Sequence, residues 1–213
     1  MGQTRQIVGP VLLWLLVAAT IGALSTVPSW SAELSETMAV EPWIGVGQVI
    51  SPIVMIILVI FYVIMLVRTR AAREHLSFVR LLFGAGTTLL IALLSFILQN
   101  SFDNPRPCHT VELHGTCPAV ESFAYPSSFA VIAFALAVGL AYAVPWTSYL
   151  VFPLAVLEGV ASILSGYQFP HDVLVGAVLG GIGAIGLLYM FSKVQARIAA
   201  NMADTASGKA VQK

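Results

Sequence analysis

Six long apolar runs, separated by short polar segments, are the dominant pattern of this chain. Each reaches roughly the 20 residues that an α-helix needs to cross the hydrocarbon core of a bilayer. The runs are continuous rather than alternating, which predicts transmembrane helices and not the strands of a barrel. They extend over about Ile7 to Ser25, Val46 to Val67, Leu81 to Gln99, Pro126 to Val144, Ser148 to Tyr167 and Val173 to Ser192.

The first run ends in small residues, Ala23 to Ser25, that would make a passable cleavage site for a secretory signal. The run is longer than a typical signal core, so we expect it to be retained as the first transmembrane helix. No second domain, long linker or low-complexity tract follows. We therefore expect one membrane domain over residues 1–198 and a flexible cytoplasmic tail over residues 199–213.

The segment between the first two runs has a different periodicity. Trp30, Leu34 and Met38 recur every four residues, with glutamates at other positions around them. This spacing predicts a short amphipathic helix at the membrane interface. The helix is either a connector, the interpretation we favour, or a lid or partner surface.

Small residues recur in the sixth run, where Gly176, Gly180 and Ala184 are four positions apart. Such spacing lets a neighbouring helix approach closely in lipid. We favour packing within this chain, with a seam between two chains as the alternative. Glu158, midway along the fifth run, is either a functional carboxyl group or a protonated one that hydrogen-bonds within the bundle, for example to Ser162.

Composition supports the membrane class. The chain is 58% hydrophobic and 9% charged, whereas soluble proteins carry about 25% charged residues. Its mean hydropathy is +0.91 and its formal net charge is zero. We expect membrane lipids, and not nucleic acid, among its partners.

The zero net charge hides a strong asymmetry. Of the ten Lys and Arg residues, all except Arg106 fall on one side of the predicted bundle. Because loops rich in Lys and Arg stay in the cytoplasm, we expect both termini to be cytoplasmic. The opposite side carries Arg106 and the acidic residues Glu33, Glu36, Glu41, Asp103, Glu112, Glu121 and Asp172.

Cys108 and Cys117 are the only cysteines, and both lie in the predicted external loop between the third and fourth runs. An oxidising compartment and the nine-residue separation favour a disulfide that stiffens the segment after Arg106. His109 and His114 share this loop, so a metal site is the alternative. The spacing matches no standard zinc pattern, and we expect no metal.

Three short stretches fall where the predicted helices meet this external side: Gln99 to Pro107 (QNSFDNPRP), Tyr125 to Phe129 (YPSSF) and Ala161 to Asp172 (ASILSGYQFPHD). In order and spacing they resemble the signature motifs of the type 2 phosphatidic acid phosphatase (PAP2) superfamily, usually written KxxxxxxRP, PSGH and SRxxxxxHxxxD. The resemblance implies an all-α bundle of six transmembrane helices. It also implies one extracytoplasmic site, where cations and a helix N-terminus hold a phosphate.

The resemblance assigns roles that several residues of this chain cannot fill. In the family a third-motif histidine attacks phosphorus, and here that position is Gln168, whose amide is no such nucleophile. A second-motif histidine protonates the leaving group, and here that position is Phe129, which has no proton to give. The other replacements are Gln99 for the family lysine, Ser162 for an arginine and Ser128 for a glycine, while the matching residues are Arg106, Pro107, Pro126, Ser127 and Asp172.

The surviving charges suggest a changed role for the pocket. We expect Arg106 and Asp172 to pair as a structural bridge, because either charge alone is costly near the membrane. His171 is a possible rescue base. Adjacent helical residues point about 100 degrees apart, however, so we favour a His171 that caps its helix or faces the headgroups.

Losing one preorganised oxyanion donor costs about 3 to 4 kcal/mol of barrier, and this site lacks two cations as well as its nucleophile and acid. We therefore expect no phosphatase activity by the family mechanism and no cofactor. The leading hypothesis is an inactive accessory, structural or lipid-binding subunit of a larger respiratory or cell-envelope membrane complex. The rival is a lipid phosphate or prenyl pyrophosphate phosphatase, or a transferase, with rearranged catalytic residues. A lipid carrier is a weaker third.

Overall fold

The computed structural model describes residues 2–110, 117–119 and 123–211. Within these ranges the regular structure is helical, without a strand. The elements are α1 (Gly2–Ala23), α2 (Ser29–Met38), α3 (Trp43–Ala71), α4 (His75–Phe102), α5 (Pro107–Thr110), α6 (Ser128–Ala143), the 3-10 turn η1 (Pro145–Thr147), α7 (Ser148–Leu164), α8 (Pro170–Met190) and α9 (Ser192–Val211).

Among the described residues, four helical segments are long and apolar enough to cross a membrane: Trp43–Ala71, His75–Thr110, Pro145–Leu164 and Pro170–Met190. The apolar helices Val8–Ala23 and Ser128–Ala143 are shorter. The chain is thus an all-α, multi-pass membrane protein. A six-pass topology with both termini in the cytoplasm stays a prediction.

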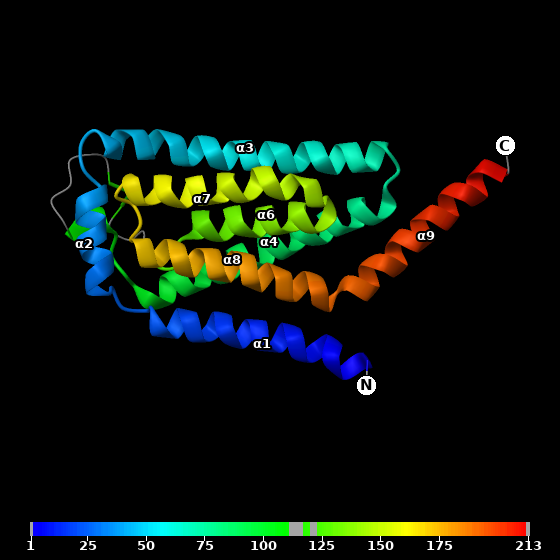
Figure 1. Ribbon diagram of the computed structural model, residues 1–213, viewed down its shortest axis with the longest axis horizontal. Coiled ribbons are helices and arrows are strands. Elements are labelled where there is room, and N and C mark those ends of the chain that lie inside the picture. Colours follow the sequence, from blue (N-terminus) through cyan, green and yellow to red (C-terminus); the bar gives the residue numbers. More distant parts are fainter. Residues whose placement is uncertain (1, 111–116, 120–122, 212–213) are drawn as a thin grey trace.

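Helix α6 forms the centre of the bundle. It packs against α4, α7 and α8, and also against α3, while α1 lies on the outer face of α8 (Figure 1). Its sequence explains this position, because small alanines and Gly139 let four neighbours approach. Most of its residues are buried, including Ala130, Ala133, Ala137 and Leu140. The two ends of the bundle differ: α2 lies across one end, and α9 leaves from the other.

The close contact between α6 and α8 depends on glycines of α8. A methyl group on Gly176 would lie 2.6 Å from the Ser127 carbonyl oxygen, and one on Gly180 would meet the Val131 carbonyl oxygen. The small-residue spacing therefore serves packing within this chain, the interpretation that the sequence favoured.

A buried polar cluster joins α3 to α7 within the bundle. The Glu158 carboxyl group accepts hydrogen bonds from the Ser162 hydroxyl at 2.7 Å and from the Ser51 hydroxyl at 3.1 Å. The predicted bond between Glu158 and Ser162 is confirmed, and Ser51 is a partner that sequence reasoning missed. Both bonds end on Oε1 of a carboxyl group that would otherwise be costly in lipid, while Oε2 is buried without a hydrogen-bond partner among the described residues.

The chain after Ala199, where we expected a flexible tail, continues as helix within α9 as far as Val211. The segment contains no proline and is rich in alanine, the strongest helix former. Helix α9 as a whole contacts α4, and Ala199 is buried.

Candidate functional site

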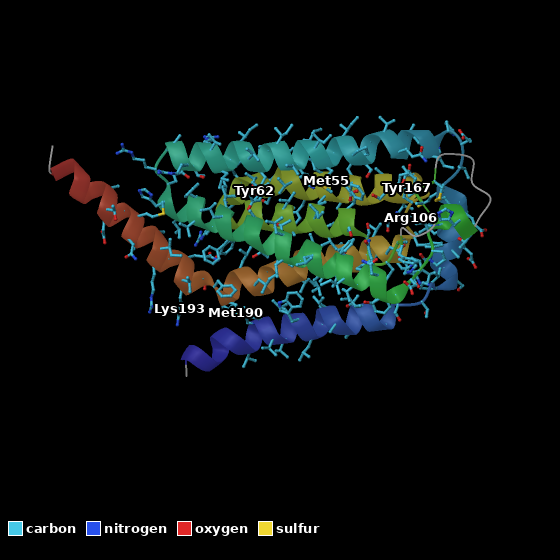
Figure 2. The ribbon with its side chains drawn as sticks, turned by 180° about the vertical axis from the view of Figure 1, so that it is seen from behind. Met55, Tyr62, Arg106, Tyr167, Met190 and Lys193 are labelled. Carbon is cyan, nitrogen blue, oxygen red and sulfur yellow. A yellow bond between two sulfur atoms is a disulfide. The ribbon has the colours of Figure 1, made fainter. Side chains whose placement is uncertain are left out.

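The three motif stretches meet at the end of the bundle that α2 covers. The first spans the end of α4 and the segment after it, the second leads into α6, and the third spans the end of α7 and the start of α8. A backbone hydrogen bond joins two of them, since Ser127 N donates to Asp172 O at 3.1 Å. Figure 2 labels Arg106 and Tyr167 at this end and Lys193 at the opposite one. The structure thus brings together Arg106, Ser127, Gln168 and Asp172.

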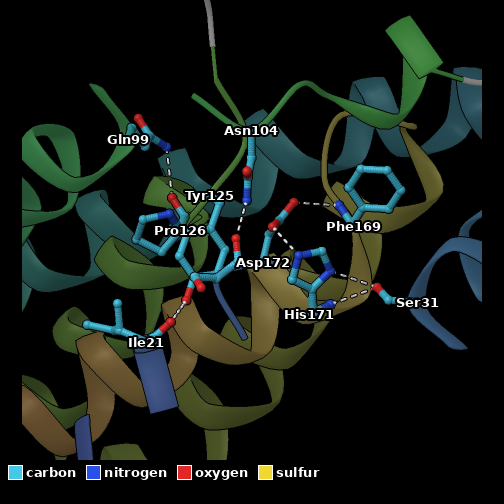
Figure 3. Close-up of polar contacts among 10 residues, drawn as sticks. Ile21, Ser31, Gln99, Asn104, Tyr125, Pro126, Phe169, His171 and Asp172 are labelled. Atoms are coloured by element: carbon cyan, nitrogen blue, oxygen red, sulfur yellow. Dashed lines mark hydrogen bonds and ion pairs between the residues drawn. The ribbon is translucent and has the colours of Figure 1, made fainter. Parts of the chain in front are cut away.

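Asp172 is fully buried in the first turn of α8. Its Oδ2 accepts a hydrogen bond from the backbone N–H of Phe169 at 2.9 Å (Figure 3). This bond caps the helix, because it satisfies a donor that no residue within the helix can reach. Pro170 opens the same turn, a position where its missing N–H costs nothing.

Arg106 reaches the same region from the segment before α5. Its Nη1 donates to the Tyr167 carbonyl oxygen at 3.0 Å. Burial lowers the pKa of Arg106, and the nearby charge of Asp172 partly offsets that effect. Within the described residues, the contact that Asp172 makes with a basic side chain at 4.0 Å or less is with the His171 ring. The predicted bridge between Arg106 and Asp172 is therefore not a direct ion pair, and the two charges attract each other at longer range.

Gln168 occupies the space between Arg106 and the loop before α6. A guanidinium group only donates, so the amide oxygen of Gln168 faces it. In that orientation the oxygen accepts from Arg106 Nη1 at 2.9 Å, and the amide nitrogen donates to the Ala124 carbonyl oxygen at 2.8 Å. Gln168 is 2% exposed, so this amide is a buried bridge.

His171 lies within the site, where it is fully buried. The expectation that it faces the headgroups is wrong. Its Nε2 lies 3.1 Å from Asp172 Oδ1 and its Nδ1 lies 2.9 Å from the Ser31 hydroxyl. The Ser31 hydroxyl also accepts from the His171 backbone N–H at 3.1 Å. Figure 3 shows the ring between Ser31 and Asp172. Among the described residues, Nε2 and Asp172 Oδ1 are in contact without forming a well-aligned hydrogen bond.

Helix α2 closes this end with a face that the sequence pattern did not reveal. Ser31 and Ser35 are its buried residues, whereas Trp30 and Leu34 are 43% and 40% exposed. The predicted helix exists, and its serines face the bundle together with Met38, which packs against Ala130, Ile163 and Val173. The signal was the pair of serines four residues apart, which the hydrophobic pattern outweighed.

We predict that Ser31→Ala loosens α2. The variant removes both hydrogen bonds to His171 and leaves two buried nitrogens without them, which costs about 1 to 3 kcal/mol. Amide hydrogen exchange should then rise in α2. The control is Thr37→Ala, because the Thr37 hydroxyl is exposed and bonds only to Leu34 O within the same helix. Equal exchange rates in the two variants would refute the closing role of Ser31.

Four of the residues expected in the pocket lie apart from the buried group around Asp172. Gln99 donates to the Pro126 carbonyl oxygen at 2.8 Å, and Ser128 pairs with Ser95 at 3.2 Å. Ser162 belongs to the Glu158 cluster described above. Phe129 is 44% exposed and lies outside the buried site.

Tyr125 is a site neighbour that sequence reasoning passed over. It is buried, its hydroxyl donates to the Ile21 carbonyl oxygen, and its ring stacks on His171 at 5.9 Å between centroids. Burial, and then the negative charge of Asp172, raise the pKa of its hydroxyl. The residue ties α1 to the histidine side of the site.

The predicted disulfide between Cys108 and Cys117 is confirmed. Cys108 N also donates to the Gly166 carbonyl oxygen at 3.2 Å, which holds this loop against the turn between α7 and α8. His109 Nε2 lies 3.3 Å from the Cys117 sulfur, so these three residues could gather around a metal only with the disulfide reduced. His114 lies outside the described residues.

Comparisons with known proteins agree with this geometry. The sequence model of the PAP2 superfamily matches residues 78–196, more than half of the chain. A solved structure, that of a transmembrane PAP2-type phosphatidylglycerolphosphate phosphatase from Bacillus subtilis, is similar with a TM-score of 0.65. The similarity covers 86% of this chain and 96% of that one at 23% identity, which shows a shared fold. No curated protein matches the sequence. The chain therefore belongs to the PAP2 superfamily of membrane proteins.

Proposed function

We propose that this protein is a catalytically inactive PAP2-like subunit that contributes surface, or a bound lipid, to a larger membrane complex. One observation carries the proposal: the Gln168 amide fills the nucleophile position and holds Arg106, the surviving cation of the motifs. A guanidinium bonded to Gln168 and Tyr167 has fewer donors left for a phosphate.

Phosphoryl transfer depends mainly on positioning and on cations that balance the charge of the oxygens. Here the buried groups around Asp172 are an amide, a serine that caps α6 and a histidine held by α2. Phe129, at the acid position, faces outward. Neither these groups nor their directions supply the nucleophile and the acid of the family mechanism.

The extensive lipid-facing surface supports a role in assembly. Large apolar side chains on the outer helices are more than half exposed, as with Leu89 at 72% and Val67 at 62%. Such surfaces suit lipid or other membrane helices. A protein that catalyses no reaction would act through contacts of this surface with other subunits, in a respiratory or cell-envelope complex.

The decisive experiment is a native pull-down of the full chain from mild detergent, followed by identification of co-purifying subunits. We expect a stoichiometric membrane complex that persists in an Asp172→Asn variant, because assembly requires no catalysis. A chain that remains alone in several mild detergents would contradict the accessory role.

The second candidate is a phosphatase with rearranged groups, which the contact between His171 and Asp172 favours. His171 is fully buried beneath α2 and its Nδ1 contacts the Ser31 hydroxyl, so attack on phosphorus would require α2 to move away. The test is phosphate release from phosphatidic acid and phosphatidylglycerol phosphate by purified protein, with Thr37→Ala as the control. Release that His171→Ala and Arg106→Ala abolish would establish this function and overturn the first.

A further inference from the structure

The end of the bundle opposite the motif site carries a cavity of about 590 Å³ between the α3–α4 turn and α9. Arg70, Arg73 and His75 line it from the turn, and Ile198, Asn201 and Met202 line it from α9. No carboxylate belongs to this lining. Figure 1 shows the turn and α9 at the same end.

Arg73 has a backbone conformation that its residue type does not favour. Its φ is 58°, in the left-handed region where glycine is the low-cost residue. The turn between α3 and α4 therefore keeps a large cation where glycine would fit better. Unfavourable conformations that persist in this way are concentrated at binding sites.

Arg70 connects this cavity to an apolar groove. The groove, of about 330 Å³, is lined by Leu66, Val67, Ala71 and Phe78 as well as by Arg70. The Arg70 guanidinium lies over the Phe78 ring, 5.7 Å from its centroid. Val67 is 62% exposed, so the groove opens on the lipid-facing side of α3. The cavity lined by Arg70 and Arg73 thus continues into the apolar groove, at the end of the bundle where α3 meets α4.

We propose that this pair of cavities binds an anionic phospholipid, with its phosphate between Arg70 and Arg73 and an acyl chain along Leu66 and Phe78. Arginine holds phosphate oxygens in a bidentate manner. Asn201 and Thr205 add neutral polar groups from α9. The lipid would join α9 to the α3–α4 turn, independently of the motif site at the other end.

The test compares lipid retention by the purified full chain in native mass spectrometry, with phosphatidylglycerol and phosphatidylcholine as probes. The variant combines Arg70→Gln with Arg73→Gly, because glycine relieves the left-handed φ and preserves the turn. The matched control is Arg197→Gln, a basic residue of α9 outside the cavity lining. Each basic residue near a lipid surface contributes roughly fivefold in affinity, so we expect about a 25-fold loss of phosphatidylglycerol retention when both are replaced.

Retention of phosphatidylcholine should change little, and the control should keep most of its phosphatidylglycerol. A thermal scan of Arg73→Gly alone should show a folded chain at least as stable as the wild type. Inorganic phosphate at matched ionic strength tests the source of the anion: weak competition is expected, since it lacks the acyl chain. Complete displacement by millimolar phosphate, or equal losses in variant and control, would overturn the lipid site.

Discussion

Gly180→Ala should destabilise the bundle by about 2 to 3 kcal/mol or more, because the added methyl group would meet the backbone of α6. The carbonyl carbon and oxygen of Val131 lie in its way. Val131 lies in the first turn of α6, and its hydrogen-bonded backbone cannot move aside as a flexible side chain can. Overpacking of this kind typically costs 1 to 3 kcal/mol, and occasionally more.

The neighbouring residue provides the control. A methyl group on Gly181 would have no neighbour within 4 Å, so Gly181→Ala should be neutral or stabilising by up to about 1 kcal/mol through helix propensity. Unfolding of both variants in mixed detergent micelles, followed by circular dichroism, measures the difference. If Gly180→Ala were as stable as Gly181→Ala, the close approach of α6 and α8 described here would be wrong.

Asp172→Ala is the second large effect, since it leaves the Phe169 N–H buried without its acceptor. It also removes the negative charge near Arg106. Losing a buried, charge-assisted hydrogen bond of this kind should cost about 3 kcal/mol. Asp172→Asn retains an oxygen that can accept from Phe169 N, so its loss should be less than half as large.

The same detergent unfolding assay separates these two variants, and exchange of the Phe169 amide reports the capping bond directly. A purely catalytic Asp172 would predict the opposite pattern, with both variants as stable as the wild type. Equal stability of Asp172→Ala and the wild type would therefore refute the structural role assigned to this carboxyl group.

The sequence allowed the fold to be predicted because apolar run length and motif spacing both reflect the backbone. The backbone places four site residues at helix ends on one side of the bundle, and this placement does not depend on their side-chain rotamers. These residues are Arg106, Ser127, Gln168 and Asp172. The bond from Ser162 to Glu158 could be predicted for the same reason, since residues four apart share one helix face.

Side-chain direction at the site could not be predicted, because it depends on neighbours from distant segments. Phe129 faces outward although it follows the buried Ser127 by only two residues. His171 is held by Ser31, 140 residues earlier. The amphipathic pattern of α2 predicted the helix but not which face meets the bundle. A buried histidine requires a polar partner, and that requirement orients the serines inward.

The cluster of Ser51, Ser162 and Glu158 also has a consequence for biogenesis. Helix α3 packs most extensively against α7, a helix that leaves the ribosome about a hundred residues later. Until then, α3 resides in the bilayer without its principal partner, and Ser51 has no carboxyl group to bond. Insertion of α3 and its final docking are therefore separate events, and the polar cluster sets the register when the second event occurs.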